Sequence, residues 1–296
     1  MPSDRIIKNR IKTTKNIRQI TKAMEMVSAS KMRKSQQQAT SSKPYSKKLQ
    51  ESLQRLAGVA DAGKHSLLKT NKSGKHIAIL IGPDKGLTGG MISNLLKEAD
   101  GFASGLNGDN SFEFITIGKR AREYAVKMDY EILAEFSNMS DHLSFEDTLP
   151  ISKMVLDGYI SKEYQDVSII YMDFISTLVQ KSNVNQILPI AVEPILSPQT
   201  PEKLIEEDVS SRYDYIFEPS AEEVLDWVLP YYVEVLIYQT FLEAKASEHS
   251  ARMVAMKNAS DNAKEIIDDL TLAFNKSRQA NITNELLDIT TATYTS

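Results

Sequence analysis

A glycine-rich stretch is the first place in this sequence where residue types and spacing could do chemistry. GPDKGLTGG runs from Gly82 to Gly90 and follows the apolar run IAILI. A turn of this kind after a strand can hold a phosphate on its backbone amides. The phosphate-loop pattern G-x-x-x-x-G-K-[ST] is absent, however, because Leu87 and Thr88 follow Gly86, and the dinucleotide pattern G-x-G-x-x-G is absent too. We interpret the stretch as a turn whose glycines, Gly86, Gly89 and Gly90, serve backbone geometry.

Other reactive groups give no catalytic pattern. The chain has no cysteine, which excludes disulfides, thiolate metal sites and cysteine nucleophiles. Adjacent acids occur at 206–208 and 268–269, where a solvated face is the simpler explanation. The histidines have no ligand-like spacing; they are His65, His76, His142 and His249. We therefore expect no catalytic residue, no cofactor and no metal. The alternative, resting on the glycine loop alone, is an α/β nucleotide-binding enzyme with helical extensions.

Charge is distributed very unevenly. Residues 1–48 contain 13 basic and two acidic side chains, whereas the rest of the chain contains 22 basic and 37 acidic ones. Such a basic segment is typical of proteins with an acidic partner. Nucleic acid is the third hypothesis, ranked last, because no aromatic side chain precedes Tyr45 for stacking on bases. The amino terminus does not resemble a signal peptide, and apolar runs reach only about five residues, so we expect a soluble, intracellular chain without a membrane span.

The two ends of the chain predict long helices. Residues 3–43 and 231–296 contain neither Gly nor Pro. In the first segment, a 3-4-3 spacing predicts one apolar stripe, made of Ile17, Ile20, Met24 and Val27. In the second, steps of four and three run over six heptads through apolar or small residues and a few polar interruptions; they are Val228, Tyr232, Val235, Gln239, Leu242, Ala246, His249, Met253, Met256, Ser260, Ala263, Ile267, Leu270 and Phe274. We expect the two helices to bury these stripes against each other as an antiparallel coiled coil.

Between these helices, strands alternate with helices, which predicts an open, mostly parallel α/β sheet. The expected strands are 76–81, 112–118, 130–136, 166–174 and a possible one at 185–190; the expected helices are 91–100, 119–127 and 145–161. The exposed acidic loop SPQTPEKLIEED follows. We assign the domains as an N-terminal coiled-coil helix (1–58), an α/β middle domain (59–218) and a C-terminal coiled-coil helix (219–296).

Four segments carry a resemblance to one family. ITKAMEMVSASKMRKSQ (20–36) and ASEHSARMVAMKNASDNA (246–263) resemble the terminal signatures of the gamma subunit of F-type ATP synthase. FNKSRQANITNELLDI (274–289) resembles the family's final helix, and DKGLTGGMISNL (84–95) its middle-domain loop. The family commonly has Arg and often Cys where this sequence has Lys85 and Thr88, so cysteine-based regulation is out of reach. The cysteine-bearing insert of the chloroplast form is also missing.

The resemblance implies a central rotor shaft in which the antiparallel coiled coil carries an inserted Rossmann-like α/β domain. Its implied partners are three alpha and three beta subunits, the epsilon subunit and the c-ring, at the cytoplasmic face of the bacterial inner membrane. Ion flow turns the c-ring, and the shaft presents a different face to each beta subunit, which carries the nucleotide chemistry. The chain itself is then non-catalytic, with no cofactor and no nucleic-acid partner.

The resemblance also implies residue roles. The expected contacts with beta subunits are Met24, Lys31, Arg33, Lys34, Arg252, Arg278, Gln279 and Thr283. The expected apolar bearing at the tip is Ile282, Leu286 and Ile289, in a stretch with no Lys or Arg after Arg278. In YDYIFEPS, Tyr215 and Glu218 are expected to face the c-ring and epsilon subunit.

Overall fold

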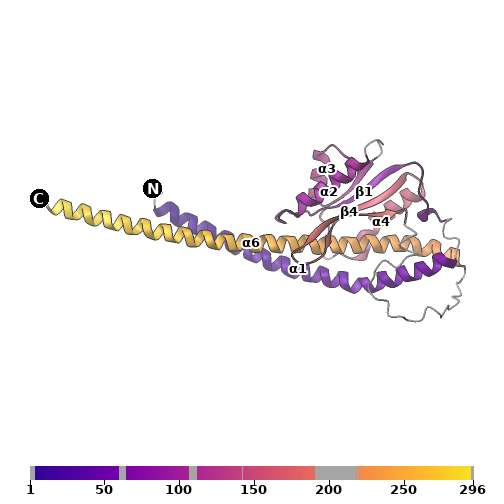
Figure 1. Ribbon diagram of the computed structural model, residues 1–296, viewed down its shortest axis with the longest axis horizontal. Helices are drawn as coiled ribbons and strands as arrows, with labels where there is room; N and C mark the ends of the chain where they lie inside the picture. Colours follow the sequence, from indigo (N-terminus) through magenta and orange to yellow (C-terminus); the bar gives the residue numbers. More distant parts are fainter. Residues whose placement is uncertain are drawn as a thin grey trace.

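The computed structural model describes residues 4–59, 65–106, 112–141, 143–190, 218 and 220–294. Two very long helices lie side by side, and an α/β domain packs against one side of the pair (Figure 1). This agrees with the fold class expected from the sequence, a coiled coil with an inserted α/β domain. No helix among the described residues has an apolar stretch long enough to cross a bilayer.

The coiled coil consists of α1 (Asp4–Val59) and α6 (Ala221–Tyr294). Its antiparallel direction is confirmed by hydrogen bonds from Ser42 to Gln239 at one end and from Ser277 to Asp4 at the other. Each helix contains one internal proline, Pro44 in α1 and Pro230 in α6. A proline removes one helical hydrogen bond, and the burial along such long packed helices outweighs that loss.

The contact seam agrees with the sequence on α6 and differs on α1. Every member of the predicted α6 pattern is buried or half-buried. The predicted α1 stripe was wrong, because Ile17, Ile20 and Val27 are largely exposed, Ile20 by 60%. The buried α1 residues are three large apolar ones and three small ones; they are Ile7, Met32, Leu53, Ser28, Ser35 and Ala39. The small residues let the two helices approach closely, and two of them are polar, so hydropathy does not indicate them.

The middle domain is built on one five-stranded sheet of order β3-β2-β1-β4-β5. Pairs among the first four strands are parallel, and β5 is antiparallel to β4. The strands are β1 (Lys75–Ile81), β2 (Phe112–Ile117), β3 (Glu131–Phe136), β4 (Tyr164–Phe174) and β5 (Gln180–Leu188). The fifth strand therefore starts earlier than the expected 185–190, because a polar edge strand such as KSNVN lacks a strong apolar signal.

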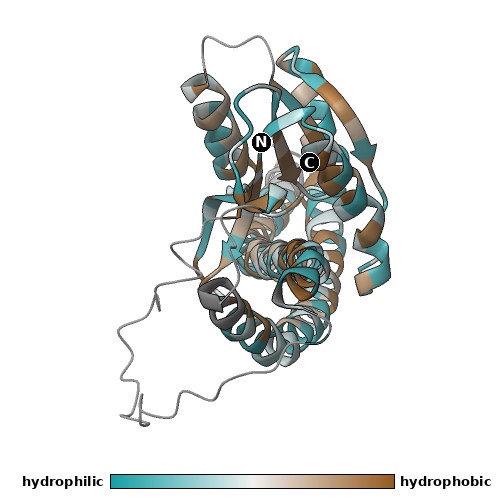
Figure 2. Cartoon of the chain, turned by 90° about the vertical axis from the view of Figure 1, so that its right-hand side faces the viewer, coloured by the Kyte–Doolittle hydropathy of each residue, from teal (hydrophilic) through white to brown (hydrophobic). Residues whose placement is uncertain are grey.

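Helices cover both faces of this sheet. They are the short η2 (Ser66–Leu68), α2 (Met91–Gly105), α3 (Lys119–Lys127) and α4 (Phe145–Ile160). Alternate β1 residues point to opposite sides: Ile77 and Ile79 pack with α4 and α6, while Ala78 packs with α2 and α3. Figure 2, which looks along the coiled coil, shows this apolar sheet between helices. Thus α6 belongs both to the coiled coil and to the core of the middle domain.

Candidate functional site

The glycine loop lies at the carboxyl end of β1, between the sheet and α6. Gly89 has a φ of +61°, a left-handed conformation that favours glycine. Gly90 has an ordinary helical φ of −78°, and Gly86 is not among the positive-φ residues. Only Gly89 of the three predicted glycines is therefore required by backbone conformation.

Asp84, in the glycine loop, ties the loop to two neighbouring segments of the domain. One carboxylate oxygen of Asp84 accepts hydrogen bonds from the backbone N–H of Lys119 (3.1 Å) and of Asn138 (3.2 Å). Lys119 begins α3, so the carboxylate lies at a helix N-terminus, where a negative charge is favourable. These bonds give the loop a structural role within the domain.

Arg252 of α6 holds the same loop from the other side. Its guanidinium donates to the carbonyls of Lys85 (3.1 Å) and Gly86 (3.3 Å) and to the carboxylate of Glu248 (2.8 Å). Only 8% of Arg252 is exposed. This side chain, expected to contact a beta subunit, is therefore used inside the chain, where a planar fork of donors can satisfy several acceptors at once.

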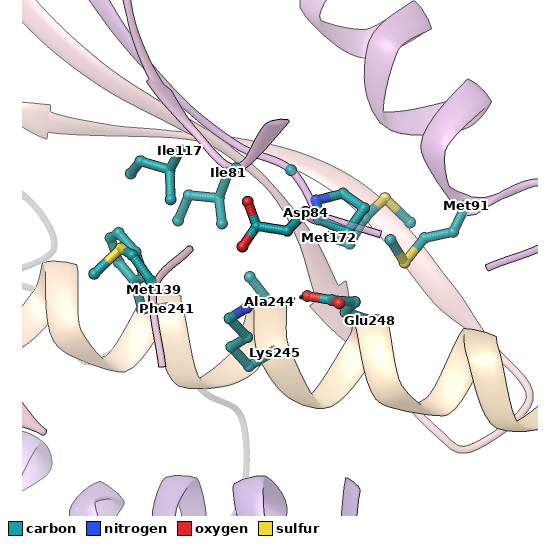
Figure 3. Close-up of a pocket in the computed structure, with 13 residues that line it drawn as sticks. Ile81, Asp84, Met91, Ile117, Met139, Met172, Phe241, Ala244, Lys245 and Glu248 are labelled. Carbon is teal, nitrogen blue, oxygen red and sulfur yellow. Dashed lines mark hydrogen bonds and ion pairs between the residues drawn. The ribbon is translucent and has the colours of Figure 1, made fainter. Parts of the chain in front are cut away.

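Glu248 is the centre of a buried charged group on α6. Its carboxylate also accepts from Lys245 at 3.3 Å, and all three residues are buried. Burial alone would raise the pKa of Glu248, but the charges of Lys245 and Arg252 outweigh it, so the pKa is lowered. Figure 3 shows Lys245 and Glu248 facing Asp84 across a small cavity of about 20 Å³, which is room for about one water molecule.

Lys31 of α1 reaches the middle domain. Its ammonium lies 2.6 Å from the carboxylate of Asp141, in the loop between β3 and α4. Asp141 also lies 3.6 Å from Nε2 of His249, whose ring is 2% exposed and makes no hydrogen bond among the described residues. Burial would raise the pKa of Asp141, but its bond to Lys31 and the charge of Lys31 lower it overall.

A larger cavity of about 590 Å³ lies beside these groups, where α1, α6 and the loops after β1 and β3 meet. Met24 lines it and is half-buried, and Lys31, Arg252 and His249 line it as well. Arg33 and Lys34 are exposed on α1. The structure thus brings together three of the predicted contact residues, Met24, Lys31 and Arg252, at the junction of the middle domain with both helices.

The remaining predicted residues lie far from this junction. Asp4, at the start of α1, accepts hydrogen bonds from Ser277 and Asn281 of α6, so α6 continues beyond its partner (Figure 1). In this part of α6, all the expected tip residues are exposed: Arg278, Gln279, Ile282, Thr283, Leu286 and Ile289. Glu218 is exposed, and Tyr215 lies outside the described residues.

The sequence analysis missed Glu248, Lys245, Asp84 and Asp141 as members of this junction. One signal was present: Lys245, Glu248, His249 and Arg252 are spaced so that they share one helix face. Of these four residues only His249 belonged to the expected seam, so the charged residues beside it on the helix could have indicated a polar contact. Among the described residues, no three His, Asp or Glu side chains are grouped to hold a metal ion.

Comparisons with known proteins agree on one family. The ATP synthase family model matches residues 3–294 of the chain. The ATP synthase gamma chain of Roseiflexus sp. (strain RS-1) is 42% identical over 98% of this chain and 97% of its own length. The chain belongs to the ATP synthase gamma chain family. A gamma chain of Dehalococcoides mccartyi is also 40% identical over 98% of this chain and 97% of its own length.

Solved structures share the fold of this gamma chain. The central stalk/c-ring structure of Tetrahymena thermophila mitochondrial ATP synthase contains a chain with a TM-score of 0.60 and 23% identity, covering 81% of this chain and 99% of that one. The rotor structure of the Euglena gracilis enzyme gives a TM-score of 0.61 at 16% identity, covering 94% and 98%. At these identities the likeness concerns the fold alone. It includes the long paired helices.

Proposed function

We propose that this gamma chain is the central rotor shaft of an F-type ATP synthase and performs no catalysis itself. The observation that carries the proposal is the antiparallel pair α1 and α6, in helices of 56 and 74 residues, with α6 extending past its partner. A helix of that length reaches roughly 110 Å. Such an element can carry rotation between separate subunits, and the absence of both phosphate-binding sequence patterns from the glycine loop argues against nucleotide chemistry there.

The partners follow from the family. Ion-driven rotation of a c-ring would turn the shaft inside three alpha and three beta subunits, with the epsilon subunit near the middle domain. The complex would work at the cytoplasmic face of the bacterial inner membrane, with this chain as a peripheral subunit. A shaft with different faces favours a different conformation of each beta subunit, because a contact shifts an equilibrium only by its difference in affinity for the two states.

Exposure supports some of the expected contacts more directly than others. Arg33 and Lys34 on α1, together with Arg278, Gln279 and Thr283 near the tip of α6, are exposed, as a contact with beta subunits requires. The exposed apolar residues Ile282, Leu286 and Ile289 suit a bearing without fixed ion pairs. Met24 is half-buried and open to a cavity. Glu218, together with Tyr215 three residues before it in the sequence, is proposed for the c-ring and epsilon side.

The test is reconstitution with alpha and beta subunits. We expect the complex to contain one copy of this chain with three of each, to hydrolyse ATP, and to rotate a bead fixed to the middle domain. The purified chain should neither hydrolyse ATP nor bind ATP or NAD at millimolar concentration in calorimetric titration. Strong ATPase activity of the chain alone would overturn the proposal in favour of a nucleotide-binding enzyme.

A further inference from the structure

We propose that a polar clamp fixes the angle of the middle domain on the coiled coil and thereby sets how efficiently rotation is transmitted. The clamp consists of Lys31 on α1, Glu248 and Arg252 on α6, and Asp84 and Asp141 in two loops at the carboxyl ends of β1 and β3. This proposal rests on the shaft function and adds an internal route for torque between the shaft and its outer domain.

The need for a clamp follows from where the chain connections lie. α1 ends at Val59 and α6 begins at Ala221, at the same end of the coiled coil (Figure 1). Arg252 is 31 residues further along α6, which is roughly 45 Å of helix. Between these points, α6 packs on the sheet through apolar residues such as Val233, Ile237 and Phe241. Apolar contacts hold the domain on but are non-directional, whereas hydrogen-bonded charges fix an orientation.

The first limb of the clamp runs from α6 into the domain. Glu248 orients the guanidinium of Arg252, and Arg252 holds the carbonyls of Lys85 and Gly86. The adjacent Asp84 binds the backbone N–H groups of Lys119 and Asn138. Movement of α6 is therefore passed through one loop to the start of α3 and to the end of β3.

The second limb runs from α1. The ion pair between Lys31 and Asp141 joins α1 to the loop after β3, which is the loop that Asp84 also holds through Asn138. The two limbs consequently meet in residues 138–141. One limb is attached to each helix, so the clamp moves with α1 and α6 when they rotate together. Neither limb alone would fix the angle of the middle domain on the two helices.

The clamp is tested first in the isolated full-length chain by hydrogen exchange. In Arg252→Gln we expect the amides of Lys119 and Asn138 to exchange at least about ten-fold faster, because the loop that carries Asp84 loses the guanidinium that holds the carbonyls of Lys85 and Gly86. Lys257→Gln is the matched control, since Lys257 is an exposed cation on the same helix. Unchanged exchange in Arg252→Gln would overturn the first limb.

The second test measures coupling in the reconstituted complex in sealed vesicles. Asp141→Asn and Lys31→Gln should each lower the protons pumped per ATP hydrolysed, while the double variant should be no worse than either single one. Asp141→Glu, which keeps the charge, should restore most of the ratio. Asp157→Asn, at an exposed carboxylate on α4, is the control.

The outcomes separate the clamp from the shaft function. Pumping by the complex that does not depend on this chain would overturn the shaft proposal and the clamp with it. Normal pumping by the unmodified complex, with unchanged ratios in all clamp variants, would overturn the clamp alone. Where a variant does not assemble, the exchange rates of Lys119 and Asn138 in the isolated Asp141→Asn chain decide: faster exchange supports the clamp, and unchanged exchange overturns it.

Discussion

At the residue scale, the junction shows how a buried charge is kept. Glu248 keeps its charge because its ion pairs with Lys245 and Arg252 replace the interactions with water that the carboxylate loses on burial. His249 lies beside them without a hydrogen bond, so it is most stable as the neutral ring. The sequence indicated Arg252 by resemblance and His249 by its heptad position. It gave no sign of Asp84 and Asp141, because loop geometry brings them to α6 from distant positions.

His249 predicts a pH dependence of stability. Burial lowers its pKa to about 4, and the charges of Arg252 and Lys245 act in the same direction against Glu248 and Asp141. An unfolded histidine takes up a proton as the pH falls below about 6.5, whereas the folded one does not until about pH 4. Stability is therefore lost as the pH falls from 6.5 to 4, by about 3 kcal/mol from this group.

Urea unfolding of the full chain between pH 7 and pH 4 measures this loss. The comparison is His249→Gln, which removes the titrating ring but keeps a polar side chain. The variant should show a shallower decline of unfolding free energy over the same range. Parallel curves for the two chains would contradict a neutral, buried His249.

Gly118 predicts a strong local constraint. Its φ is +85°, and an added Cβ would lie 2.1 Å from the carbonyl oxygen of Gly82. We expect Gly118→Ala to lower the unfolding free energy by more than about 3 kcal/mol. Gly101→Ala is the control inside α2, where a Cβ meets nothing within 4 Å, and it should stabilise the chain by about 0.5–1 kcal/mol. Thermal unfolding of the two variants should shift in opposite directions.

At the element scale, periodicity predicted the helices and strands but not every packed face. The α6 seam was read correctly because its heptads are long and its apolar residues face two neighbours, α1 and the sheet. On α1, hydropathy pointed to Ile17, Ile20 and Val27, yet Ser28 and Ser35 are buried. Hydropathy alone cannot identify a seam that is selected for small size. The start of the polar edge strand β5 was predicted too late for a related reason. This strand is defined by its pairing with β4 and not by the burial of apolar side chains.

The exposed α1 stripe predicts a difference between two substitutions. Ile20→Gln should change the unfolding free energy of the isolated chain by less than about 0.5 kcal/mol, because its side chain is already in water. Met32→Ala should cost about 2–3 kcal/mol, because Met32 is buried. Denaturant titration of both variants measures the two values. A large loss in Ile20→Gln would mean that the stripe packs within the chain after all.

At the scale of the whole molecule, α6 extends beyond Asp4, the first described residue of its partner helix. The tip of α6 beyond Asn281 carries exposed Ile282, Leu286 and Leu287. An isolated helix of about a dozen residues is marginal in water, so this segment depends on partners for its stability. The fold of the chain gives α6 its length, and we expect the other subunits of the complex to bury the apolar side chains at its tip.

Removing the tip should therefore affect the complex and not the isolated chain. We expect a chain ending at Asn281 to unfold within about 1 °C of the full-length chain, because the lost residues make few internal contacts. The reconstituted complex should melt at a lower temperature, since the apolar surface of the tip is no longer buried. Calorimetric scans of both preparations test this, and equal melting of the two complexes would argue against a bearing at the tip.

The separation of the two paired helices in the sequence has a consequence for synthesis in the cell. α1 ends at Val59, and its partner begins only at Ala221. At typical elongation rates, roughly ten to thirty seconds pass between the two points. During that time the nascent α1 has no partner helix from its own chain. The strands of the sheet precede α6 in the sequence, so the sheet can already fold. The high density of positive charge in residues 1–48 keeps this unpaired segment soluble, because copies of it repel one another. The basic helix thereby also protects the nascent chain from aggregation.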